Sequence, residues 1–316
     1  MRGAARALAR FADSDFVYSF SRSPIAILSL LVVAVCILAA AFAPLIAPHD
    51  PFNLASLNLM DSFRPPLLAP DGEWTYPLGT DDQGRDVLSG IMFGMRISLL
   101  VGVASIVFAS IVGVAIGLVA GYAGGMTDAV LMRVADVQLT FPAILIALLV
   151  DGVVRAALPK DMHEALGIYV IILAIGIARW PQFARTVRGS TLVERNRDYV
   201  MAARVIGLSR VRIMATHILP NVLGPVLVIA TLTLGLAILD EATLSFLGVG
   251  LPVTQPSLGT LIRIGNDFLF SGEWWVTIFP GVALVLMVLS INLLGDWLRD
   301  ALNPRLRGWR CSTSMR

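Results

Sequence analysis

The stretch from Ile97 to Ala120 reads ISLLVGVASIVFASIVGVAIGLVA and contains no charged residue. A helix needs about 20 apolar residues to cross the roughly 30 Å hydrocarbon core of a bilayer, so this stretch predicts a membrane-spanning helix. The composition of the whole chain agrees, because 57% of its 316 residues are hydrophobic and only 15% are charged. A soluble domain has about 25% charged residues. The sequence therefore predicts an integral membrane protein.

Five further stretches have the length and apolarity of a spanning helix. They are residues 25–43, 129–150, 166–180, 222–239 and 274–294. A seventh apolar stretch, 242–262, contains two prolines and three glycines, which argue against an uninterrupted helix in lipid. We expect that stretch to form a re-entrant or surface loop. The predicted fold is thus an all-α membrane protein with about six transmembrane helices.

The basic residues predict the orientation of these helices. If the N-terminus is inside, most of the 24 lysines and arginines fall in the N-terminal segment, the loop between the fourth and fifth spans (Arg179 to Arg212), and the C-terminal tail. Cytoplasmic loops are enriched in Lys and Arg, so both termini are predicted to be cytoplasmic. Cys36 and Cys311 then lie in different phases, and we expect no disulfide between them.

Several classes of function lack their residue patterns. The single lysine, Lys160, does not stand in the Gly-x-x-x-x-Gly-Lys-Ser/Thr pattern of a phosphate-binding loop. The sequence also has no His-Glu-x-x-His, Gly-x-Ser-x-Gly or Cys-x-x-Cys motif. We therefore predict no catalytic residue and no metal site, and the net charge of +2 gives no indication of nucleic-acid binding.

The longest basic loop contains the sequence RDYVMAARVIGLS from Arg197 to Ser209. The residues that can share one helical face are Tyr199, Val200, Ala203 and Ile206. Gly207 suits a left-handed C-terminal cap and Ser209 an N-cap for a second helix, 210–219, that we expect to stop at Pro220. Two interpretations remain open from the pattern alone. The pair of helices forms a compact knob on the cytoplasmic face, or it lies as an amphipathic helix on lipid.

The long outer segment between the first two spans is rich in turn residues. Asp81, Arg85 and Asp86 are expected to tie this loop into turns and to cap the helix that leads to Ser98. The alternative is that the segment is a docking surface for another protein.

Small residues recur at every fourth position of the second span, at Ser105, Ala109, Gly113, Gly117 and Gly121. This spacing keeps them on one face and predicts close packing against another span or a partner subunit.

Charged residues within spans are costly in lipid and therefore informative. Arg133 and Asp136 are three residues apart in the third span, where they can pair with each other or extend to the membrane surface. Asp240 and Glu241 end the fifth span near its outer side. They are expected either to be hydrated at the membrane edge or to line the outer mouth of a pathway.

Several of these motifs together resemble a known family. Ala202-Ala203, Gly207 and Ile218-Leu219-Pro220 resemble the "EAA" loop of bacterial ABC importer permeases. Five other stretches resemble the dipeptide/oligopeptide/nickel branch of that family, and FAPLIAP at 42–48 resembles its C-type second permease. The five stretches are PLGTDDQGRDVLS at 77–89, GYAGG at 121–125, HILPN at 217–221, EATLSFLG at 241–248 and GDWLRDALNP at 295–304.

This resemblance implies a type I ABC importer permease fold in the bacterial inner membrane, moving peptides or related small solutes. It divides the chain into a cytoplasmic segment (1–24), a first helix with a long periplasmic loop (25–96), a five-helix permease core (97–300) and a basic cytoplasmic tail (301–316). The implied partners are a second, homologous permease, two ATPase subunits and a periplasmic binding protein. No cofactor is expected on this chain, because the ATPase subunits would bind ATP and Mg²⁺.

The resemblance also implies site residues. The ATPase-coupling loop, about 190–220, would use Asp198, Tyr199, Ala202, Ala203, Arg204, Gly207, Leu219 and Pro220. The periplasmic-loop signature comprises Gly79, Thr80, Asp81, Gly84, Arg85 and Asp86. One departure is Met201, which stands where the family often has a glutamate, so Asp198 or Glu194 would have to replace that carboxylate. A self-contained secondary transporter is the main alternative, but the sequence has no convincing internal repeat and few charges within its spans.

Overall fold

The computed structural model describes residues 20–51, 59–159, 162–251 and 255–302. Five helices in these ranges are long and apolar enough to cross a membrane. They are α3 (Pro24–Ala41), α5 (Val87–Ala123), α8 (His163–Glu194), α11 (Leu219–Phe246) and α13 (Trp275–Leu302). A bent pair of helices, α6 (Gly125–Thr140) and α7 (Ala143–Ala157), is apolar enough to be a sixth, broken span or a re-entrant loop. The described ranges contain no β-strand, only an isolated bridge between Thr80 and Asp86, so the all-α prediction is confirmed.

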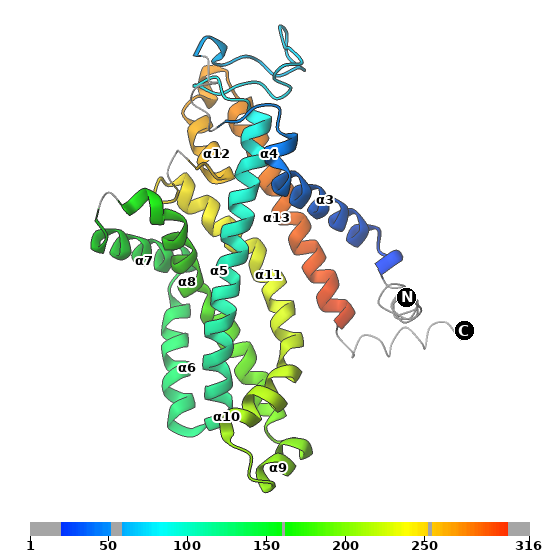
Figure 1. Cartoon of the computed structure of the whole chain (residues 1–316), viewed down its shortest axis with the longest axis vertical. Helices are drawn as coiled ribbons and strands as arrows, with labels where there is room; N and C mark the ends of the chain where they lie inside the picture. Colours follow the sequence, from blue (N-terminus) through cyan, green and yellow to red (C-terminus); the bar gives the residue numbers. More distant parts are fainter. Residues whose placement is uncertain (1–19, 52–58, 160–161, 252–254, 303–316) are drawn as a thin grey trace.

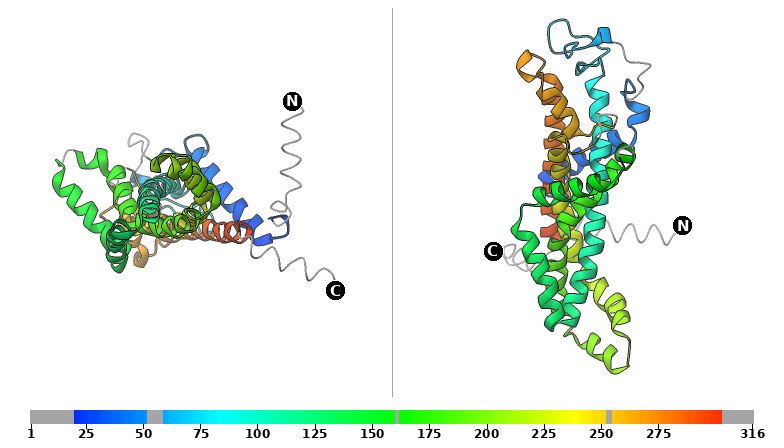
Figure 2. Two further views of the ribbon diagram at one scale, coloured as in Figure 1. Left: turned by 90° about the horizontal axis from the view of Figure 1, so that it is seen from below. Right: turned by 90° about the vertical axis from the view of Figure 1, so that its left-hand side faces the viewer.

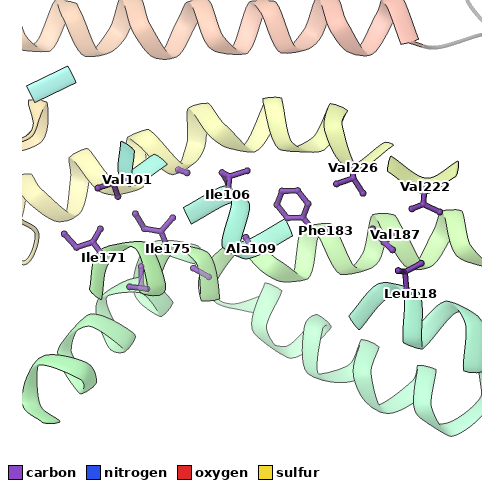
Figure 3. Packing of buried hydrophobic residues seen from close by; sticks show 14 of the residues in the cluster. Val101, Ile106, Ala109, Leu118, Ile171, Ile175, Phe183, Val187, Val222 and Val226 are labelled. Carbon is purple, nitrogen blue, oxygen red and sulfur yellow. The ribbon is translucent and has the colours of Figure 1, made fainter. Parts of the chain in front are cut away.

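The helices form an elongated bundle with α5, α8 and α11 at its centre (Figure 1). Buried apolar side chains from these three helices make a continuous core, which includes Val101, Phe183 and Val226 (Figure 3). A second core joins α3, α5, α11 and α13. The short helices α4 (Ala43–Ile46), η1 (Leu59–Asp61), α12 (Leu258–Asn266) and η4 (Leu269–Ser271) lie toward one end of the bundle.

The small residues of α5 face α8, as their spacing predicted. A Cβ atom added to Gly113 would lie 2.4 Å from Cβ of Phe183, and one added to Gly117 would lie 2.6 Å from the carbonyl oxygen of Ala184. Gly121 approaches Thr191 in the same way, at 2.7 Å from its Cβ. The two helix backbones are therefore in near contact, which only glycine permits at these positions.

The third span is broken, and the prediction of one uninterrupted helix over 129–150 is wrong. The chain bends by 98° between α6 and α7, at Phe141 and Pro142, whose backbones are extended. Proline disfavours helical geometry in the residue before it, which explains why the helix stops there. Helix α7 consequently runs across the bundle (Figures 1 and 2). Of the two alternatives for Arg133 and Asp136, the pairing with each other is not found among the described ion pairs, and Asp136 instead lies 3.8 Å from Nε of Arg185 on α8.

The fourth span is longer than predicted. Helix α8 continues through Arg179 and Pro181 to Glu194, so Arg179 lies within a span and not in the basic loop. The 242–262 stretch also differs from the expected loop. Its first residues complete α11, and its last residues begin α12, which is N-capped by Ser257.

The described ends of the chain lie on the same side of the bundle, since the rings of Phe20 and Trp297 pack edge to face with centroids 5.0 Å apart. An even number of crossings accounts for this. The predicted cytoplasmic orientation of both termini stays a prediction. Residues 1–19 and 303–316, together with Cys311 and Lys160, lie outside the described residues.

Candidate functional site

Two short helices project from the end of the bundle opposite α12 (Figures 1 and 2). They are α9 (Asp198–Val205) and α10 (Arg210–Ile213), and we call residues 198–213 the α9–α10 protrusion. Of the two open interpretations, the knob of two short helices agrees with this arrangement, since α9 and α10 are separate helices joined by a turn.

The turn between the two helices is defined by its caps. Gly207 has a φ of +84°, which an L side chain rarely adopts. Its N–H donates to the Arg204 carbonyl, and the N–H of Leu208 donates to the Ala203 carbonyl, which is the Schellman pattern. The Ser209 hydroxyl then accepts from the Arg212 N–H and caps α10. Both predicted caps are confirmed.

The protrusion is anchored to the bundle by its inner face. Val200, Ala203 and Ile213 are buried in the same core as Leu118 of α5 and Val187 of α8. The predicted stripe of Tyr199, Val200, Ala203 and Ile206 is therefore only half correct, because Ile206 is 77% exposed at the turn. Displacing the protrusion must displace the ends of α5 and α8 as well.

Tyr199 links the protrusion to both neighbouring helices. Its hydroxyl donates to the Glu194 carboxylate at the end of α8 and accepts from the Asn221 side chain at the start of α11, at 3.1 Å. Burial, together with the hydrogen bond to Glu194, raises the pKa of the Tyr199 hydroxyl. Glu194 is thereby engaged inside the chain, whereas Asp198 is exposed in the first turn of α9.

The second helix of the protrusion leads directly into α11. After Ile213 the backbone forms a π-helical turn, Met214–Ile218, and continues as α11 with Pro220 in its first turn. The expected stop at Pro220 is wrong, because proline is tolerated in a first turn and the π turn precedes it. Leu219 and Pro220 are therefore part of a continuous connection from the protrusion to the centre of the bundle.

The predicted site at the outer side of the fifth span is instead an internal contact. Asp240 accepts hydrogen bonds from Nε and Nη2 of Arg179, at 2.8 and 2.6 Å, and Glu241 is fully buried. The Glu241 carboxylate accepts from Ser98 of α5 and from Ser245. Both carboxylates therefore have partners within the chain, and their suggested role at the outer mouth of a pathway stays a prediction. The sequence showed Arg179 as a charge in an apolar stretch, but it gave no signal for Ser98.

The signature at the other end of the bundle folds the outer loop. Asp81 accepts from the Arg85 N–H and from Nε of Arg85, at 2.9 and 2.7 Å. Asp86 caps α5 by accepting from the Ser89 N–H at 2.9 Å. Burial, and the charge of Asp81 next to it, raise the pKa of the Asp82 carboxyl.

The remaining signature residues support the same turns. Thr80 is buried and accepts from the Arg64 N–H, and its carbonyl accepts from Trp275. Gly79 and Gly84 both have positive φ, +81° and +75°. In the parts of the chain that the structure describes, no group of three or more His, Cys, Asp or Glu side chains is placed to hold a metal ion.

Comparisons with known proteins agree with this arrangement. The family model described as "Binding-protein-dependent transport system inner membrane component" matches residues 113–308. A second, "N-terminal TM domain of oligopeptide transport permease C", matches residues 14–70, which confirms the resemblance to the C-type permease.

Relatives cover nearly the whole chain. The di/tripeptide transport system permease protein DppC of Pseudomonas aeruginosa is 37% identical over 93% of this chain and 92% of its own length. The oligopeptide transport system permease protein OppC of Bacillus subtilis is 36% identical over 93% and 90%. In structure, the inward-facing MetNI methionine ABC transporter matches with a TM-score of 0.52 at 20% identity, over 66% of this chain and 94% of that one. The chain belongs to the family of binding-protein-dependent transport system inner membrane components.

Proposed function

We propose that this chain is one of two membrane subunits of an ATP-driven importer of peptides, which ATPase subunits drive through the α9–α10 protrusion. The curated relatives that match over most of the chain are named as dipeptide and oligopeptide permeases, which supports a peptide as the solute. The chain itself is non-catalytic in this proposal, and the ATPase subunits bind ATP and Mg²⁺.

The observation that carries the proposal is the apolar tip of the protrusion. Val205, Ile206 and Val211 of the protrusion are 88%, 77% and 71% exposed, and α9 and α10 lie at one extreme end of the molecule (Figure 1). Exposed apolar patches at a defined surface mark sites where another protein binds. A cleft of the ATPase subunit that receives the tip would bury them.

The contacts within the chain suggest how movement of this tip reaches the bundle. The protrusion continues through the π turn into α11. Helix α11 is joined to α8 by the Arg179–Asp240 ion pair and to α5 by the Ser98–Glu241 hydrogen bond. ATP binding would pull the protrusion and rock these helices together between inward-open and outward-open states.

The opposite end of the bundle is assigned to delivery of the solute. The folded outer loop, with the signature from Gly79 to Asp86, would face the periplasm and meet a substrate-binding protein. This orientation places both termini in the cytoplasm and the chain in the inner membrane, beside a second permease.

The test compares two exposed apolar residues in the complete complex. Ile206→Asp is expected to abolish binding of the ATPase subunits and peptide uptake in proteoliposomes. Met126→Asp is the control, because Met126 is 78% exposed in the first turn of α6 and lies outside the protrusion. Equal losses in both variants would refute a specific role for the tip. Uphill uptake by the purified chain alone would refute the proposed function.

A further inference from the structure

We propose that the α9–α10 protrusion receives a carboxylate side chain of the ATPase subunit in a cavity lined by Arg204 and Arg210. The inference rests on the proposed function, and it adds the charge of the partner surface. In this interface the membrane subunit supplies the positive charge and the ATPase subunit supplies the carboxylate, which is the reverse of an interface in which the membrane subunit supplies a glutamate.

The cavity lies between the protrusion and the end of α5, and its volume is about 470 Å³. Its lining residues are Val119, Tyr122, Ala123, Arg204, Leu208, Arg210, Ile213 and Met214. The two arginines are the only charged residues among them. A space of this size beside two guanidinium groups suits an anionic side chain better than a neutral one.

Arg204 is held in position by two contacts. Its Cζ atom lies 5.1 Å from the centre of the Tyr122 ring, within the range of a cation–π interaction. Its Nη2 atom donates to the Arg195 carbonyl at 3.4 Å. Tyr122 belongs to the GYAGG motif, so this contact gives the motif a role in orienting the arginine. An ordered guanidinium is suited to paired hydrogen bonds with a carboxylate.

Neither arginine has a counter-charge among the residues that the structure describes. Within the described ranges, no ion pair involves Arg204 or Arg210. The nearby acidic residues are engaged elsewhere, since Asp128 pairs with Arg188 and Glu194 accepts from Tyr199. Asp198 is exposed and is not part of the cavity wall. The described residues therefore leave both arginines open to a carboxylate from another chain.

A protein side chain fits this site better than a lipid headgroup. The exposed apolar residues, Val205, Ile206 and Val211, gather at the turn beside the cavity. A helix that lies on lipid instead shows an apolar stripe along its length. An occupant that covers both the apolar tip and the cationic cavity needs apolar and acidic groups on one surface, as a protein cleft provides.

Met201 supports the reversed polarity. It is 48% exposed on α9, and its thioether supplies no negative charge to the protrusion. The charged groups that the protrusion does direct into its cavity are positive. The partner surface is therefore expected to be acidic.

The experiment measures the affinity of the purified ATPase subunits for the permease pair in nanodiscs. Arg204→Glu is expected to weaken binding about 30-fold or more, because loss of one partner of a desolvated charge pair is costly. Arg204→Lys should keep most of the affinity. Arg212→Glu is the matched control, since Arg212 is exposed on α10 outside the cavity, and it should change the affinity less than about threefold.

A photo-crosslinker at Leu208 then identifies the ATPase peptide that enters the cavity. An Asp or Glu in that peptide, changed to Arg, should restore binding to the Arg204→Glu variant. Three results would overturn the inference: equal effects of Arg204→Glu and Arg212→Glu, a crosslinked peptide without a carboxylate, or an effect of Arg204→Glu only on binding to anionic-lipid vesicles. If Ile206→Asp abolishes binding while Arg204→Glu does not, only this inference fails. If the wild-type pair binds no ATPase subunit, the proposed function fails.

Discussion

The Arg179–Asp240 pair offers the sharpest test of how the bundle is held together. The two side chains are 9% and 13% exposed, and two hydrogen bonds join them between α8 and α11. Asp240→Ala leaves a guanidinium buried without a partner, which costs about 3–5 kcal/mol. Replacing both residues, as in Arg179→Met with Asp240→Leu, removes the unpaired charge and should recover most of that loss.

The assay is a double-mutant cycle on thermal unfolding of the purified chain in detergent. Each single variant should lower the unfolding midpoint by at least about 5 °C, whereas the double variant should lie near wild type. The coupling between the two sites isolates their interaction. If the stability losses of the two single variants are additive, or if the single variants unfold at the same temperature as the wild type, the pair does not form.

Three further predictions concern other contacts. Gly117→Ala should destabilise the chain by about 1–3 kcal/mol in the same unfolding assay, because the added Cβ would meet the Ala184 carbonyl oxygen. Gly281→Ala is the control and should leave stability unchanged, because a Cβ at Gly281 would lie in open space. Equal effects of the two substitutions would contradict the close approach of α5 and α8. Asp86→Ala should cost about 1 kcal/mol by removing the cap of α5 and should speed proteolysis of the outer loop, while unchanged proteolysis would argue against the cap. Because the pKa of Tyr199 is raised in the folded chain, the stability that its hydroxyl contributes is complete below pH 10 and is lost as the hydroxyl ionises at higher pH. Tyr199→Phe should remove this alkaline loss of stability. An identical alkaline stability profile for Tyr199→Phe and wild type would disprove the contribution.

The apolar stretches predicted most of the helices because length and lack of charge are local properties. Gly207 and Ser209 were likewise identified from local cap chemistry, and both form the expected caps. These features depend on a few consecutive residues and on general backbone preferences. A single sequence is sufficient to find them.

The failures have two physical origins. The bend at Pro142 was overlooked because residues on both sides are apolar, although proline after Phe141 was a visible signal. The partners of Arg179 and Glu241 were not predictable, since Asp240 and Ser98 are 61 and 143 residues away, respectively. Such contacts depend on how the helices pack. The neighbouring carboxylates 240 and 241 therefore looked available for solute, although both are used inside the bundle.

The glycine contacts between α5 and α8 limit which movements the protein can make. With backbone against backbone at Gly113, Gly117 and Gly121, there is no layer of flexible side chains to absorb sliding or rotation of one helix on the other. The two helices should turn as a single rigid beam. Rearrangement during a transport cycle would then occur at the boundaries of this beam, where α5 and α8 meet the other helices.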